Sequence, residues 1–275
     1  MSKDFSTYLV PVDFTPASVS STLFTIGLAN NEKDSIILLH IIKSEREHLL
    51  ASKTMDEFVL THCAGNKNVQ SKVVIGNVSE EIGEAAKILE SDLIVLGTHC
   101  AAGLGKLFNS YAFKIIDESP TPLLIVQEET SFQQIKKIVM TIDLERGSIQ
   151  ILTMAAKMSK LFNSEIILVA ADQTDHYFKG KRDVNLIVCK KYLTEHKVPH
   201  SIVFVDGKHF VENIFKLCKE QNADMLAATY YQQHVHVFTD SFVRTLANNE
   251  FHLPLLTMAE EATHSSGQFG AMFSN

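Results

Sequence analysis

The chain repeats itself once, and this repeat limits the possible folds more than any other feature. Residues 8–13 resemble 138–143, and residues 36–40 resemble 166–170, in both cases 130 positions later. Two further pairs, 91–94 with 223–226 and 122–125 with 254–257, lie 132 positions apart. A spacing that changes by only two residues over four blocks indicates a repeated domain rather than a short solenoid unit. Two such domains can pack as a built-in dimer, and each can keep or lose a binding site independently.

The length of the chain fits two domains of common size. We place them at residues 1–130 and 131–260, joined at a short polar stretch, 128–134, that has neither glycine nor proline. So short a linker keeps the domains adjacent. Residues 261–275 are rich in serine and glycine and show no periodicity, so we expect a mobile tail.

Composition excludes several classes of protein. A net charge of −7 and a pI near 5.9 argue against a nucleic-acid or anionic-membrane binder, which needs a basic surface. No stretch approaches 18 apolar residues, and the first ten residues do not form a signal peptide, so we expect no membrane association. The four cysteines form no CxxC pair, which favours the reducing cytoplasm over a disulfide framework.

Apolar strands alternate with amphipathic helices in each half, which is the pattern of a mostly parallel α/β sheet. The fold class predicted is two Rossmann-like domains, each with a five-stranded sheet flanked by helices, packed as a pseudo-dimer. Strands are expected at 8–12, 35–40, 71–75, 93–96 and 123–126, then at 137–142, 165–170, 201–205, 225–228 and 255–258. Helices are expected near 16–30, 46–62, 78–90 and 106–118, then near 147–162, 183–196, 210–221 and 239–249.

We also expect the last strand of each half to pair with its counterpart within the chain. That pairing would leave no further sheet edge exposed, and the chain would then be monomeric. A homodimer of the whole chain is the alternative.

Asp13 follows the first strand directly, where open α/β sheets bind ligands. Its carboxylate could accept a hydrogen bond from a ligand, or it could cap the following helix or begin a turn. Asp143 repeats the position in the second half, as a capping residue would.

A glycine-containing segment, 97–111, follows the fourth strand of the first half. Glycines between a strand and a helix let the backbone approach a phosphate closely. The segment is not a P-loop, because Cys100 and Leu107 occupy two of the required positions. The first strand is not followed by GxGxxG, which argues against a dinucleotide-binding fold.

Together these motifs resemble the universal stress protein family. The resemblance rests on Val-Pro-Val-Asp-Phe at 10–14, Leu-Leu-His-Ile at 38–41, Gly-Thr-His at 97–99 and Pro-Thr-Pro-Leu-Leu-Ile-Val at 120–126. It covers both halves, and implies a tandem protein of the adenine nucleotide alpha hydrolase-like fold. Nucleotide-binding members hold ATP through a G-x2-G-x9-G-[S/T] loop, the strand-one aspartate and the residue after the strand-two histidine.

Carried over, the resemblance assigns an ATP or AMP site to the first domain. Asp13 and Ile41 match the adenine side, and Gly97 matches the first glycine of the phosphate loop. The full set of site residues predicted is Pro11, Val12, Asp13, Ile41, Gly97, Thr98, His99, Gly103, Ser110 and Tyr111. Three positions depart from the motif: Cys100 replaces its second glycine, Ser110 its third, and Tyr111 its Ser/Thr. These departures predict weakened binding, because a Cβ at position 100 hinders close backbone approach.

The second domain departs further from the motif. It has no glycine between Gly207 and Gly267, and Asp240 places a negative charge where the third loop glycine would stand beside a phosphate. We therefore expect no ATP site there, and expect Tyr230 and Tyr231 to fill the pocket.

For most of the remaining polar residues near the strand ends, we expect a structural role rather than a chemical one. His234 and His236 have a spacing that zinc can use, but are read as exposed loop residues. His40 is read as a satisfied residue at a strand end. His99 either donates to a phosphate or orients the loop. Cys100, beside a helix start, is the one cysteine placed for a lowered pKa.

Three functions follow from these features. The first is a non-enzymatic stress-response protein with a weakened adenine-nucleotide site in its first domain. The alternative is a nucleotide-free interaction module whose clefts are filled by Cys100, Tyr111, Tyr230 and Asp240 and which recruits a protein partner. The third, a nucleotide hydrolase, has no paired carboxylates, activated nucleophile or metal cluster to support it.

Overall fold

A computed structural model of the chain describes residues 6–29, 33–99, 112–117, 119–231 and 240–260. The first half contains five strands: β1 (Thr7–Pro11), β2 (Ser35–Ile42), β3 (Val69–Ile75), β4 (Leu93–Thr98) and β5 (Leu123–Gln127). Its helices are α1 (Pro16–Leu28), the short 3-10 helix η1 (Glu45–Glu47), α2 (His48–His62) and α3 (Val78–Ile88), with a further helical stretch at 112–117.

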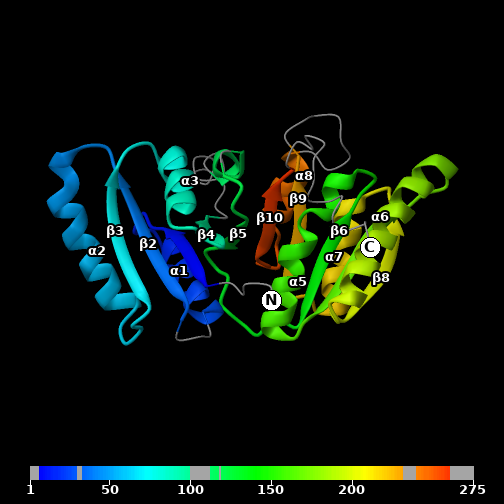
Figure 1. The fold of residues 1–275 in the computed structure, drawn as a ribbon, viewed down its shortest axis with the longest axis horizontal. Coiled ribbons are helices and arrows are strands. Elements are labelled where there is room, and N and C mark those ends of the chain that lie inside the picture. Colours follow the sequence, from blue (N-terminus) through cyan, green and yellow to red (C-terminus); the bar gives the residue numbers. More distant parts are fainter. Residues whose placement is uncertain (1–5, 30–32, 100–111, 118, 232–239, 261–275) are drawn as a thin grey trace.

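The second half repeats this plan (Figure 1). Its strands are β6 (Lys137–Ile142), β7 (Glu165–Asp172), β8 (His200–Asp206), β9 (Met225–Tyr230) and β10 (Leu255–Ala259). Its helices are η2 (Arg146–Ile149), α5 (Leu152–Phe162), α6 (His176–Glu195), α7 (Phe210–Gln221) and α8 (Asp240–Ala247). The α/β class and the parallel pairing within each half are as predicted.

The two halves share one ten-stranded sheet in the order β3-β2-β1-β4-β5-β10-β9-β6-β7-β8. Pairing is parallel within each half, and the single antiparallel junction joins β5 to β10, with Leu124 opposite Leu256. The predicted pairing of the two last strands is therefore confirmed. The expectation that no edge remains is wrong, because the sheet stays open and, among the described strands, β3 and β8 each have one neighbour.

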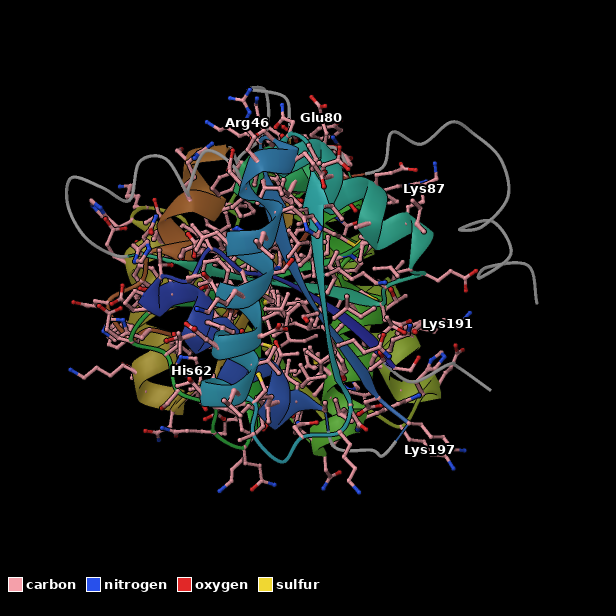
Figure 2. All side chains as sticks on the ribbon, turned by 90° about the vertical axis from the view of Figure 1, so that its left-hand side faces the viewer. Arg46, His62, Glu80, Lys87, Lys191 and Lys197 are labelled. Atoms are coloured by element: carbon pink, nitrogen blue, oxygen red, sulfur yellow. The ribbon has the colours of Figure 1, made fainter. Side chains whose placement is uncertain are left out.

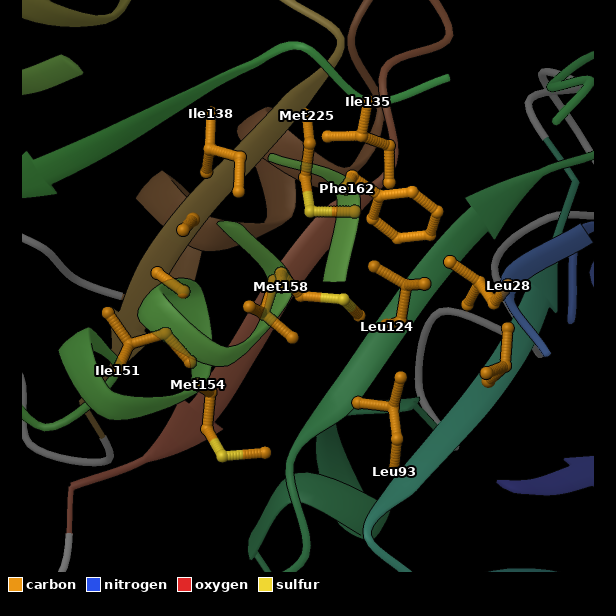
Figure 3. Packing of buried hydrophobic residues seen from close by; sticks show 14 of the residues in the cluster. Leu28, Leu93, Leu124, Ile135, Ile138, Ile151, Met154, Met158, Phe162 and Met225 are labelled. Atoms are coloured by element: carbon orange, nitrogen blue, oxygen red, sulfur yellow. The ribbon is translucent and has the colours of Figure 1, made fainter. Parts of the chain in front are cut away.

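Helices cover both faces of the sheet, and each face has a core that crosses the junction. On one face, α1, α2, α5 and α6 bury a cluster that includes Leu124, Phe162 and Met225 (Figure 3). On the other face, α3, the helical stretch 112–117, α7 and α8 bury a second cluster. Arg244 lies 3.8 Å above the ring of Phe113 from the opposite half. Because apolar packing crosses the junction on both faces, the halves form one unit.

Charged side chains lie on the outside of this arrangement. Figure 2 shows Arg46, Glu80 and Lys87 pointing away from the body at the end of the first half. Among the described residues, no helix is both long and apolar enough to cross a membrane.

Two predicted helices differ from the structure. The helix expected at 147–162 is split into η2 and α5, and the one expected at 183–196 begins at His176. Asp175 explains the earlier start, because its carboxylate accepts hydrogen bonds from the backbone N–H groups of Tyr177 (2.8 Å) and Phe178 (3.2 Å). Most of the helix expected at 106–118 and the whole tail at 261–275 lie outside the described residues.

Candidate functional site

The candidate site of the first half lies where the strand order changes direction. From β1 the chain proceeds outward through β2 to β3, then returns to place β4 on the other side of β1. In open parallel sheets, ligands bind at this switch point, outside the carboxyl ends of the strands. Asp13 follows β1 there, and the segment after Thr98 leaves β4 at the same end of the sheet.

Asp13 is held in a tight turn. Its Oδ1 accepts hydrogen bonds from the backbone N–H (3.1 Å) and the hydroxyl (2.6 Å) of Thr15. Between them, Phe14 has a φ of 65°, a left-handed conformation that costs a bulky residue about 1–2 kcal/mol. Its ring packs on His40, with 4.4 Å between ring centroids. The turn fixes the direction of the carboxylate, which remains partly exposed.

A cavity of about 160 Å³ adjoins this carboxylate. Its walls are mainly apolar and come from the ends of β1, β2 and β4, from α3 and from the stretch 112–117. They include Pro11, Val12, Asp13 and Ile41, so the structure brings together four of the predicted site residues, among them both residues matched to the adenine side. A mainly apolar cavity with one carboxylate in its lining suits a ring that also forms hydrogen bonds.

His40 also lines the cavity, and one of its ring nitrogens is already engaged. Nδ1 lies 2.7 Å from the carbonyl oxygen of Val12, so this nitrogen must donate. The interpretation of His40 as a satisfied strand-end residue is confirmed.

The predicted phosphate side is described only at its beginning. A Cβ at Gly97 would collide with the carbonyl oxygen of Ala17, so glycine lets α1 pack directly against β4. Thr98 is buried at the end of β4, and its carbonyl accepts the N–H of Glu128 (3.0 Å). His99 Nδ1 lies 2.6 Å from Glu128 Oε2, a contact that orients the ring.

Several predicted residues lie outside the described part of the chain. They are Cys100, Gly103, Ser110, Tyr111, His234 and His236. Within the described residues, no three histidine, cysteine or acidic side chains gather as metal ligands. The described cysteines, Cys63, Cys189 and Cys218, are buried free thiols, and burial raises the pKa of each.

The matching cleft of the second half contains Tyr231. This residue stands 132 positions after His99, and its side chain is only 1% exposed. Its hydroxyl lies 3.3 Å from Oδ1 of Asp143, which also accepts the backbone N–H of Glu145 (2.8 Å). The adjoining cavity measures about 80 Å³. Tyr230 instead contacts the first half, with 5.4 Å between its ring and that of Phe113.

Burial changes the ionisation of this second aspartate. Asp143 is 5% exposed, and the loss of hydration raises the pKa of its carboxyl from 3.8 to about 6. The hydrogen bonds from Glu145, Ser148 and Tyr231 oppose this shift only in part. The pKa of the Tyr231 hydroxyl is raised well above its usual range by burial and by the neighbouring Asp143.

Two polar side chains of α6 donate hydrogen bonds to backbone carbonyl groups of the second cleft. Arg182, 4% exposed, donates to the carbonyl oxygen of Ala171 (3.1 Å), which stands 130 positions after Ile41. Its guanidinium also contacts Asp172 and Asp183 and lies 4.4 Å from the ring centre of Phe204. Asn185 donates to the carbonyls of Asp143 (3.1 Å) and Glu145 (2.9 Å).

The sequence analysis missed Arg182 and Asn185. Their signal was available, because both stand at helical spacing on the stripe formed by Leu186, Cys189 and Leu193. A polar pair on an apolar stripe indicates buried hydrogen bonding.

Fold and clefts together define a tandem of doubly wound α/β domains with one open and one closed cleft. The sequence profile of the Universal stress protein family matches residues 5–127. A universal stress protein from Archaeoglobus fulgidus has a TM-score of 0.73 at 15% identity, covering 93% of this chain and 98% of that chain. A functionally unknown protein from Pseudomonas aeruginosa PAO1 has a TM-score of 0.59 at 11% identity, covering 93% of both.

A third solved structure matches only half of the chain. It is a universal stress protein family protein from Arabidopsis thaliana with AMP bound, 15% identical, covering 44% of this chain and 91% of that chain with a TM-score of 0.32. No curated protein sequence matches the chain.

Residues 5–127 therefore form a domain that the universal stress protein family profile matches, as the motifs of the first half indicated. The second half repeats the strand order of the first, and the Archaeoglobus structure shares the fold across both halves. The chain thus has two domains of the same fold, of which the first matches the universal stress protein family.

Proposed function

We propose that this protein is a non-enzymatic stress-response protein whose first domain, residues 1–130, binds one adenine nucleotide, ATP or AMP. The second domain, residues 131–260, binds none. Proteins of the family are in general non-enzymatic stress-response proteins, and some bind ATP.

The observation that carries this proposal is the apolar cavity beside Asp13. A partly exposed carboxylate can accept a hydrogen bond from the exocyclic amino group of adenine, and the apolar walls formed by Val12, Ile41 and Leu96 can contact the ring faces. The ribose and phosphates would then extend past β4 toward Gly97, Thr98 and His99. The proposal extends this side to Gly103, Ser110 and Tyr111.

Contacts in the second half argue against a second site. Tyr231 contacts Asp143, the equivalent carboxylate, and Arg182 donates to the carbonyl of Ala171, the residue equivalent to Ile41. A nucleotide there would have to break buried hydrogen bonds, each of which leaves an unsatisfied group that costs about 1–3 kcal/mol.

Calorimetric titration with Mg-ATP and with AMP tests the site. We expect one nucleotide per chain, an affinity reduced at least about tenfold by Asp13→Ala, equivalent to about 1.4 kcal/mol, and unchanged affinity in Asp143→Asn. Asp143→Asn is the matched control because it changes the same position in the other cleft. No heat at millimolar nucleotide, or equal losses in both variants, would refute the proposal. A phosphate-release assay with turnover well above background would refute the non-enzymatic part.

One observation favours the second candidate, an interaction module that needs no nucleotide. The second cleft is filled by its own side chains, so its packing is complete without a ligand. This candidate predicts a protein partner whose recovery is unaffected by ATP and by Asp13→Ala. Partner recovery that requires ATP and is lost in Asp13→Ala would instead support the nucleotide-binding function.

A further inference from the structure

The two open edges of the sheet differ in their side chains. β3 carries Lys72 at its centre, and a charged residue at this place prevents edge-to-edge pairing. β8 has only uncharged residues between its ends, Ser201 to Val205, and Phe204 is 48% exposed. β8 therefore lacks the protection that β3 has. α6 and β8 lie at the right-hand end of Figure 1.

The backbone of β8 presents an ordered set of hydrogen-bonding groups. The N–H of Ile166 in β7 donates to the carbonyl of Pro199 (2.9 Å). Since N–H and C=O groups alternate sides along a strand, odd-numbered residues of β8 point toward β7 and even-numbered residues toward the open edge. His200, Ile202, Phe204 and Asp206 thus direct their backbone groups outward.

The sequence of β8 is complementary to itself in the antiparallel direction. A two-fold axis at Val203, the central residue of β8, places Val203 opposite Val203 of a second copy. Ile202 then faces Phe204, and His200 faces Asp206. β-Branched residues opposite aromatic ones, and a histidine opposite a carboxylate, are favourable cross-strand pairs. The same operation on β3 places Lys72 opposite Lys72, which is unfavourable.

The two faces of the pairing also match. Ile202 packs against the core cluster beneath α6, whereas Val203 and Val205 pack against the cluster beneath α7. Each proposed cross-strand pair joins residues of the same face. On the first face, α6 is tied to the edge by Arg182, whose guanidinium lies over the ring of Phe204.

We infer that two copies of this chain associate through β8, which pairs antiparallel with itself about Val203 and extends the sheet across the interface. Association of identical chains about a two-fold axis uses the same surface on both subunits, as this self-complementary edge requires.

Cysteine cross-linking tests both the interface and its register. Val203 forms a non-hydrogen-bonded pair with its own copy, and the short Cα separation of such pairs permits a disulfide. We expect mild oxidation to convert most of Val203→Cys into a covalent dimer. Ser201→Cys is the matched control, since it lies on the same strand face and is also partly buried, but faces Val205 of the second copy. Wild type measures the background from the native cysteines.

Light scattering completes the test. Two chains per particle in wild type, together with selective cross-linking at position 203, would support the inference. One chain per particle, or a dimer in which Val203→Cys cross-links no more than Ser201→Cys, would overturn it. A monomer that dimerises only after removal of residues 261–275 would assign the edge to the chain's own tail and would also overturn it.

Discussion

The two clefts begin from the same motif and reach opposite states. Asp13 and Asp143 each follow the first strand of their half, and each accepts a hydrogen bond from the backbone N–H two residues later. Asp13 remains partly exposed beside an apolar cavity, while Asp143 is buried under Tyr231. The local turn is thus the same in both halves although the surroundings of the carboxylate differ. A carboxylate at this position is not evidence of a ligand until the residues that approach it from other strands and helices are known.

Removing the side chain that fills the second cleft should have the largest effect on stability. We expect Tyr231→Ala to lower the free energy of unfolding by about 3–5 kcal/mol, because it leaves a cavity in a buried site. Its matched control is His99→Ala, which removes a partly exposed contact with Glu128 and should cost less than about 1 kcal/mol. Chemical denaturation of both variants measures the difference. Equal losses of unfolding free energy would contradict the prediction that Tyr231 fills the second cleft.

The second prediction concerns pH. Folding raises the pKa of Asp143 from 3.8 to about 6, so the folded state favours the neutral carboxyl. Its stabilising contribution is complete below pH 3.8 and is lost as the pH rises through about 6. Asp143→Asn should therefore resemble wild type near pH 4 and exceed it by about 3 kcal/mol at pH 8.

Urea unfolding of wild type and Asp143→Asn at several pH values checks this. Asp13→Asn serves as the control at the equivalent, more exposed position, where we expect no comparable gain at pH 8. A wild-type and Asp143→Asn difference that does not change between pH 4 and pH 8 would contradict the buried state of Asp143.

A smaller loss of stability should follow from removing Arg182, which donates a hydrogen bond to the carbonyl of Ala171 in the second cleft. Arg182→Ala leaves the carbonyl of Ala171 without this donor and removes the contact with Phe204, at a cost of about 2 kcal/mol. The control is Ser52, a partly buried polar residue of α2 in the first half, and Ser52→Ala should cost less than about 0.5 kcal/mol. Thermal unfolding of the two variants measures the difference. Similar decreases in melting temperature would mean that Arg182 stabilises the fold no more than Ser52 does.

Much of the fold was predictable from the sequence because the strands are continuous apolar runs. Strands covered on both faces keep this pattern wherever they stand, so β2, β4, β7 and β9 were located almost to their ends. The start of α6 was not predictable in this way, since the residues from Tyr177 to Lys181 are mostly exposed and include Gly180. Its start depends on the cap formed by Asp175 rather than on an apolar stripe.

The candidate site was predictable only where neighbours in sequence are neighbours in space. Pro11, Val12 and Asp13 are consecutive, and their position at a strand end follows from topology. The environment of Asp143 instead depends on Asn185 and Tyr231, which are 42 and 88 residues away. No local pattern around Asp143 carries that information. The sequence predicted that Tyr230 and Tyr231 together fill the second pocket. Only Tyr231 contacts the carboxylate, whereas Tyr230 packs on Phe113 of the first half.

The β5–β10 junction has a consequence for how this chain could diverge. When two identical subunits assemble, every substitution is made twice, so filling one cleft fills both. Here the paired cores are encoded separately but are continuous, and the halves are free to change unequally while still supporting each other. In a single chain the second half can therefore have a filled cleft and still support, through the shared sheet and cores, the strands that carry Asp13.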